Sequence, residues 1–166
     1  PSLLSNYTVV FFGSGIGKPD GREYINNIIR ESQSRGINVE IHGRVSKAQL
    51  LRYACSSAGQ ILWPSNDNNP RAAYEGLYAG MPLMTSTTAG VPPALLEPSF
   101  VHAVPYNATT ASFKRVLAEF ISSVEEHRKS ATLRRKIVQY TEMALDPRNV
   151  YGELCRRIGV CAEEVK

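Results

Sequence analysis

Residues 60–86 read QILWPSNDNNPRAAYEGLYAGMPLMTS, and this stretch decides the fold class. It holds two apolar runs, 60–64 and 82–86, each as long as a short buried strand and closed by Pro or Ser. Between them an Asn- and Asp-rich loop leads into a predicted amphipathic helix over 70–79. Pro70 suits the start of this helix, because an N–H group in the first turn has no partner within the helix. Two strands joined by one helix predict parallel pairing, since parallel neighbours need such a crossover.

The same alternation extends in both directions along the chain. Three more apolar runs predict strands at 7–13, 38–43 and 100–105, and amphipathic segments predict helices at 20–35 and 46–57. We therefore predict an α/β fold: a Rossmann-like, doubly wound parallel sheet with helices on both faces.

The pattern becomes purely helical from about residue 109. Apolar stripes predict three C-terminal helices, at 116–124, 133–140 and 150–158, with Pro147 separating the last two. The predicted organisation is one domain over 1–166, with a sheet region at 1–108 and a helical tail at 109–166. We expect this domain to be a fragment of a larger enzyme.

Composition limits the classes of partner. The 166 residues are 43% hydrophobic and 20% charged, with a net charge of +4, and no apolar run is long enough for a membrane span. The three cysteines and three histidines lack metal-ligand spacing, so we predict no metal site and a reducing, cytoplasmic compartment. The basic stretch 127–136 predicts a solvated helix face, with a peripheral, acidic membrane surface as its alternative partner. No aromatic residue interleaves this stretch, so no nucleic-acid partner is predicted.

The glycine-rich stretch FFGSGIGKPDG, residues 11–21, matches neither of two familiar phosphate-binding motifs. Gly13 and Gly15 fit the start of a dinucleotide fingerprint, but Lys18 stands where its third glycine belongs. A P-loop would need glycine in place of Phe12. Two interpretations stay open: a tight strand-to-helix turn, or a ligand loop in which Gly13, Gly15 and Lys18 contact the bound molecule.

The start of the helix at Pro70 is the strongest candidate for binding an anion. We expect the N–H groups of Asn69, Arg71 and Ala72 to be unsatisfied there and to point at a bound anion, with the Arg71 guanidinium beside them. Asp67 before the helix and Glu75 within it can face the carboxyl ends of the strands, where open α/β sheets bind ligands. Two carboxylates would repel a bare diphosphate, so their chemistry fits sugar or ribose hydroxyls.

A family resemblance rests on these same residues. Asp67 and Glu75 are separated by seven residues, and Glu75 begins the run EGLYAGMPL. This block resembles the Glu-x7-Glu motif of group-1 (family 4) GT-B glycosyltransferases, together with the run that follows it. Two upstream stretches, VVFFGSG at 9–15 and VEIHGRVSKAQLLRYACSSAGQILWPS at 39–65, are similar to preceding strands and helix of the same family.

The resemblance implies the nucleotide-sugar-binding, C-terminal half of such an enzyme. It implies sugar transfer from a UDP- or GDP-sugar donor, with retention of configuration and without a metal or other cofactor. Asp67 and Glu75 would be the catalytic pair, with Asp67 on the sugar hydroxyls and Glu75 on the ribose. The remaining donor-binding residues would be Asn68, Asn69, Pro70, Arg71 and Ala72 at the leaving phosphate, and Arg44 and Val45 beside the base.

The chain also departs from the family pattern. Its first motif carboxylate is Asp instead of Glu, and it has no counterpart of the earlier strand whose Gly-Arg and nearby Lys neutralise the diphosphate. The acceptor-binding half would be another domain or a separate subunit. Two rival interpretations stay open: a non-catalytic glycosyltransferase-like interaction module, and another GT-B enzyme such as a nucleotide-sugar epimerase.

Overall fold

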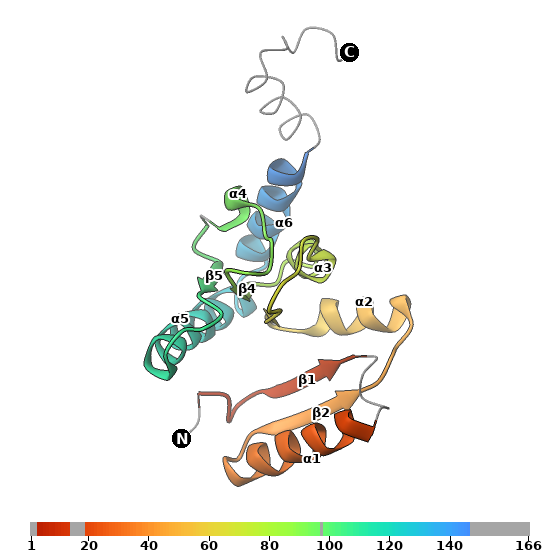
Figure 1. The fold of residues 1–166 in the computed structure, drawn as a ribbon. Coiled ribbons are helices and arrows are strands. Elements are labelled where there is room, and N and C mark those ends of the chain that lie inside the picture. The colour runs from red at the N-terminus through yellow and green to blue at the C-terminus, as the bar shows by residue number, and fades with distance from the viewer. Residues whose placement is uncertain (1–2, 14–18, 97, 147–166) are drawn as a thin grey trace, which may run out of the picture. The chain divides into compact units, whose positions relative to one another are not determined.

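The computed structural model describes residues 3–13, 19–96 and 98–146. Strands and helices alternate along the chain and every strand pair is parallel, so the predicted Rossmann-like α/β fold is confirmed (Figure 1). The chain divides into two compact units, Pro1–Tyr53 and Ala54–Lys166, and each is described by itself. The single domain over 1–166 stays a prediction.

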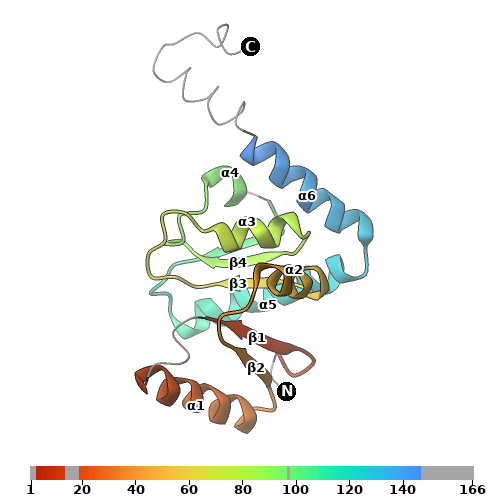
Figure 2. The ribbon, with the colours of Figure 1, turned by 90° about the vertical axis from the view of Figure 1, so that its right-hand side faces the viewer.

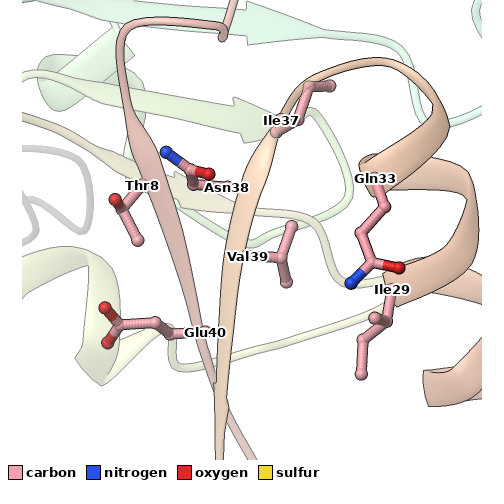
Figure 3. A pocket seen from close by; sticks show the side chains of 7 residues that line it. All are labelled: Thr8, Ile29, Gln33, Ile37, Asn38, Val39 and Glu40. Atoms are coloured by element: carbon pink, nitrogen blue, oxygen red, sulfur yellow. The ribbon is translucent and has the colours of Figure 1, made fainter.

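The first unit is built on a two-stranded parallel sheet. Strand β1 (Thr8–Phe12) and strand β2 (Asn38–His42) pair in register from Thr8 opposite Asn38 to Phe12 opposite His42, and helix α1 (Pro19–Ser34) connects them. Val39 lies on the side of Ile29 and Gln33 of α1, whereas Glu40 lies on the other side of the strands (Figure 3). Successive side chains of a strand alternate between faces, so β2 presents an apolar face to α1 and a polar face away from it.

At the carboxyl end of β2, Tyr53 of helix α2 (Lys47–Ser56) packs against the polar face of the strand. The Tyr53 ring contacts the rings of Phe12 and His42, with centroids 5.0 and 5.3 Å apart, and its hydroxyl lies 3.2 Å from His42 Nε2. Despite these contacts, no described residue of Leu3–Tyr53 is buried. The first unit therefore has no closed hydrophobic core of its own.

The second unit contains a three-stranded parallel sheet in the order β3-β4-β5. Strand β3 (Gln60–Leu62), strand β4 (Leu83–Ser86) and strand β5 (Val101–Val104) are connected through helix α3 (Arg71–Tyr78) and the short helix α4 (Pro93–Leu96). All four residues of β4 are buried, as expected for a central strand covered on both faces. The sequence analysis missed α4, which is only one turn long.

Helices cover both faces of this sheet, as predicted. On one face Leu77 of α3, Leu95 of α4 and Ile137 of helix α6 (Ala131–Leu145) form the main core with Leu83 and Val101. On the other face lies helix α5 (Thr110–Arg128), whose Phe120 ring meets the His102 ring at 5.9 Å between centroids. Figure 2 shows α3 and α5 on opposite sides of the strands.

The described strands form two sheets, whereas the sequence predicted one. Among the described strands β1 pairs only with β2, and β3 pairs only with β4. Helix α2 connects β2 of the first sheet to β3 of the second in the regular alternating order. The local pattern of apolar runs predicted each strand but carried no information about which strands are neighbours.

Two of the three predicted C-terminal helices are confirmed as α5 and α6, while Pro147 and the segment 150–158 lie outside the described residues. The prediction of one basic helix over 127–136 was wrong. Helix α5 ends at Arg128, and Ser130 starts α6 because its hydroxyl accepts a hydrogen bond from Leu133 N at 3.2 Å. His127 is buried rather than solvated.

Candidate functional site at the carboxyl edge of the second sheet

Two loops are joined where β3 and β4 end. The hydroxyls of Ser86 and Thr88 both donate to the carbonyl oxygen of Pro64, at 2.7 and 2.8 Å, and lie 3.0 Å from each other. The backbone adds a second connection, since Asp67 N donates to Thr88 O at 3.2 Å. Strand ends of a parallel sheet meet at one edge, and these bonds hold the loop before α3 in a fixed position there.

Gly90 allows the second loop to approach the first closely. It adopts φ +62°, and a Cβ atom on it would lie 2.2 Å from the carbonyl oxygen of Asp67. Only glycine combines this left-handed backbone with the absence of a side chain. The contact sets the position of Asp67, which is the first of the two predicted catalytic carboxylates.

The loop between Asp67 and α3 is organised by its own turns. Asp67 Oδ1 accepts from Asn69 N at 2.9 Å, which is an Asx-turn. Pro70, at φ −74° and ψ 66°, is the centre of an inverse γ-turn in which Arg71 N donates to Asn69 O at 2.7 Å. Pro70 O then accepts from Ala73 N at 2.8 Å and starts the helix.

These turns correct one expectation about the helix start. The N–H groups of Asn69 and Arg71 are not unsatisfied, because the Asp67 side chain and the γ-turn already engage them. Ala72 N–H is the one of the three predicted donors that has no hydrogen-bond partner among the described residues. An anion at this helix start would meet a single open amide beside the exposed side chain of Arg71.

Helix α3 places Glu75 one turn after Arg71. The buried residues of this helix are Ala73, Gly76 and Leu77, and Glu75 is half-buried on another face. Its carboxylate has no ion-pair partner within the described ranges. The structure thus brings most of the predicted donor-binding residues into one loop and the first two turns of one helix: Asp67, Asn68, Asn69, Pro70, Arg71, Ala72 and Glu75.

Tyr74 belongs to this site and was missed by the sequence analysis. Burial raises the pKa of its hydroxyl, and the negative charge of Asp67 raises it further. Both effects disfavour the ionised form, so Tyr74 is a neutral hydroxyl at neutral pH on the helix that carries Arg71 and Glu75. Nothing in the local sequence distinguishes this tyrosine from a residue that only packs against the core.

A second feature missed by the sequence analysis is a group of aromatic rings at the same edge. Trp63, directly after β3, stacks on Tyr106 with centroids 6.3 Å apart and an angle of 27° between the rings. It also meets Phe113 edge-on at 5.1 Å. Tyr106 is 47% exposed, so the rings connect the loops after β3 and β5 and still offer an apolar surface to solvent.

The remaining predicted site residues lie in the first unit or outside the described ranges. Gly13 N donates to His42 O at 3.3 Å, at the carboxyl ends of β1 and β2. In the turn after β2, Arg44 is exposed and Val45 is half-buried. Gly15 and Lys18 lie outside the described residues, so their proposed contact with a ligand stays a prediction.

Two hollows lie away from the predicted site residues. One, of about 350 Å³, lies in the first unit between α1 and the amino ends of the strands, and Ile29, Gln33 and Val39 line it (Figure 3). Another, of about 500 Å³, lies between α5 and α6 beside Phe100 and Tyr140. Neither of these two hollows includes a predicted site residue.

Two further properties bear on what this surface can bind. Within 3–13, 19–96 and 98–146, no three His, Cys, Asp or Glu residues are grouped so that they could hold a metal ion. No helix in the described part of the chain is both long enough and apolar enough to cross a membrane.

No protein-family model and no curated protein sequence matches this chain, so its function is argued from these residues and their geometry.

Proposed function

We propose that the chain is the donor-binding part of a GT-B glycosyltransferase of the group-1 type. In this proposal a UDP- or GDP-sugar lies on the carboxyl edge of the β3-β4-β5 sheet. The single observation that carries it is the fixed loop from Asp67 to Arg71, which two hydroxyls and Gly90 hold against the end of β4. An ordered loop that ends in a helix start beside two carboxylates suits a ligand with both phosphates and hydroxyls.

Each residue then has a distinct task. The half-buried Glu75 carboxylate would accept hydrogen bonds from the ribose hydroxyls, and Asp67 would accept them from the transferred sugar. The reaction breaks the bond between the anomeric carbon and the donor's phosphate oxygen, and the diphosphate leaves as the acceptor hydroxyl takes its place. The open Ala72 N–H and the Arg71 guanidinium would stabilise the negative charge that develops on the leaving phosphate. The acceptor would be held by another domain or subunit, in the cytoplasm.

A rival function has specific support. The N–H groups of Asn69 and Arg71 are already bonded within the loop, which leaves fewer donors for a diphosphate than such a site would use. A non-catalytic module that binds a protein partner through the same edge would have no need of those donors. The two proposals differ in whether a nucleoside diphosphate binds at all.

Calorimetric titration of the 166-residue chain with UDP and GDP separates them. We expect one of the two to bind, and a concentration of ten times Kd to raise the free energy of unfolding by about 1.4 kcal/mol. Glu75→Gln should weaken binding because it removes an anionic acceptor of the ribose hydroxyls. Glu142→Gln, which removes an exposed carboxylate from α6, is the matched control and should leave Kd unchanged.

The results assign the function in either direction. Absence of binding by both nucleotides would exclude the donor-binding proposal for this chain and favour the interaction module. If Glu75→Gln and Glu142→Gln changed Kd equally, the proposal that Glu75 binds the ribose hydroxyls would be wrong. Arg71→Ala tests the contact with the leaving phosphate in the same way, and Arg135→Ala, at an exposed position of α6, is its control.

A further inference from the structure

The side chain of Gln60 connects strand β3 to helix α3 within the second unit. Gln60 is the first residue of β3, and its Nε2 donates to the carbonyl oxygen of Ala72, in the first turn of the helix, at 2.7 Å. Its backbone is bound to the residue before β4, since Gln60 N donates to Pro82 O at 2.9 Å. Every atom of these contacts belongs to the unit Ala54–Lys166, so Gln60 links the sheet of this unit directly to the start of α3.

The orientation of the Gln60 carboxamide follows from this bond. Ala72 O can only accept a hydrogen bond, so the amide nitrogen must be the atom that faces it. The other carboxamide atom, Oε1, is buried and has no hydrogen-bond partner among the described residues. A buried oxygen without a donor costs stability, but turning the amide over would bring two acceptors together at Ala72. The contact with the helix therefore determines how the carboxamide lies, while its oxygen stays without a partner.

Gly76 makes room for this carboxamide. A Cβ atom on Gly76 would lie 1.5 Å from Gln60 Oε1 and 2.6 Å from Gln60 Cδ. Gly76 does not have a left-handed φ, so its backbone conformation does not require glycine. It lies inside a helix of eight residues, where alanine would favour helix formation more strongly. The space that Gln60 fills is thus the reason that the structure offers for glycine at this position.

The first turn of α3 is fixed from two directions. Its N-cap residue, Pro70, makes no side-chain hydrogen bond to the helix, so the loop before it holds the start of the helix through its own turns. The Gln60 bond holds the first turn from the side of the sheet. Arg71 and Ala72 lie in this turn and Glu75 follows it. The proposed phosphate and ribose contacts therefore depend on where the turn lies.

We propose that Gln60 is a positioning residue of the donor site: its carboxamide holds the first turn of α3 where Arg71 and Ala72 can contact the leaving phosphate. In this proposal Gln60 does not touch the donor and acts through its bond to Ala72 O. The inference rests on the proposed function for the identity of the ligand. The placement of the turn can be measured on the 166-residue chain without a ligand, so the placement and the ligand are tested separately.

Amide hydrogen exchange in the first turn of α3 measures the placement without nucleotide. Gln60→Met keeps the length of the side chain but removes the donor. The amide of Ala73, which donates to Pro70 O, should then exchange about fivefold faster. Gln139→Met, at an exposed position of α6, is the control and should leave this rate unchanged. Equal rates in Gln60→Met and the parent chain would overturn the proposal.

Gln60→Glu distinguishes the hydrogen bond from the mere filling of space. At pH 7 the ionised carboxylate cannot donate to Ala72 O, so the amide of Ala73 should again exchange about fivefold faster than in the parent chain. As the pH falls, the introduced carboxyl group binds a proton and regains a donor. The ratio of its exchange rate to that of the parent chain at the same pH should then return toward one. A ratio that stays constant with pH would contradict the role of the donor.

Gly76→Ala tests the close approach through a reversal of sign. In the parent chain the added methyl group displaces the carboxamide, so the urea midpoint of unfolding should fall. In a Gln60→Ala chain the collision is gone, and the same substitution should raise the midpoint, because alanine favours a helix more than glycine does. If Gly76→Ala lowered the midpoint equally in both chains, Gln60 would not occupy this space and the proposal would be wrong. Circular dichroism verifies that each variant is folded.

Calorimetric titration connects the contact with the ligand. For whichever of UDP and GDP binds the parent chain, Gln60→Met should raise Kd about fivefold and Gln139→Met should leave it unchanged. Faster exchange in Gln60→Met with an unchanged Kd would overturn the positioning role, because the turn would have loosened without an effect on the ligand. If neither nucleotide binds the parent chain, the donor-binding proposal fails, and the exchange rates alone decide whether Gln60 places the turn.

Discussion

Asp67 and Gly90 approach so closely that no side chain fits between them: a Cβ on Gly90 would lie 2.2 Å from the Asp67 carbonyl oxygen. The contact joins the loop after β3 to the loop after β4. It explains how a polar, Asn-rich segment acquires a defined conformation at the edge of a sheet. The position of a candidate catalytic carboxylate thus depends on a glycine more than twenty residues later in the chain.

Replacement of Gly90 by alanine should therefore be costly. The left-handed φ of +62° is strained for alanine, and the new methyl group would displace Asp67. We expect the free energy of unfolding to fall by about 1–3 kcal/mol in a denaturant titration. Gly43→Ala is the control, since its added Cβ has nothing within 4 Å, and it should change stability by less than about 0.5 kcal/mol. Equal effects of the two substitutions would contradict the close contact.

The two hydroxyl donors to Pro64 should act cooperatively. Ser86→Ala or Thr88→Val alone leaves the Pro64 carbonyl with one donor, so each should cost about 1 kcal/mol of stability. The double substitution removes both donors and should cost more than the sum of the two single changes. A double-mutant cycle in urea measures this difference. Strict additivity would mean that the hydroxyls do not share an acceptor.

The pKa of Tyr74 reports the position of Asp67 without any need for a ligand. Asp67→Asn removes the negative charge, so the pKa of Tyr74 should fall toward 10.0 but remain above it, because burial still raises it. Titration of ring-labelled tyrosine by NMR separates Tyr74 from the other seven tyrosines. Glu75→Gln should leave this pKa unchanged. If both substitutions lowered it equally, Asp67 would not be the specific neighbour of Tyr74.

His102 should make the second unit less stable in acid. Burial lowers its pKa below the usual 6.5, and the nearby charge of His127 lowers it further, against an opposing effect of Glu119. Between the folded pKa and 6.5 the unfolded chain binds more protons, so the free energy of unfolding should decrease as the pH falls through 6.5. Denaturant titrations across this range measure the slope. His102→Gln should reduce it, and an unchanged slope would assign the effect to other groups.

Local sequence patterns were sufficient for the elements and for part of the site. The strands at 38–43 and 82–86 were predicted within one residue of β2 and β4, because apolar runs bounded by Gly, Pro and Ser have few other interpretations. The helix after Pro70 was equally clear. These features depend on residues near one another in sequence, and that is the information a single chain supplies.

The features of the fold and the site that the sequence did not predict depend mainly on contacts between distant segments. The bonds from Ser86 and Thr88 to Pro64 could not be predicted from the run TSTTAG, since a hydroxyl-rich turn does not specify its acceptor. The expectation of unsatisfied N–H groups at Asn69 and Arg71 was wrong because Asp67 and Pro70 form local turns that use them. The division into two sheets could not be predicted either, because strand order depends on tertiary packing.

The uneven distribution of buried residues has a thermodynamic consequence. The heat capacity change of unfolding arises mainly from apolar surface that becomes exposed to water. The described buried residues fall between Pro70 and Thr141, and none falls in Leu3–Tyr53. Among the described residues, the second unit should therefore contribute the larger part of the heat capacity change of unfolding, and the half-buried strands β1 and β2 the smaller part.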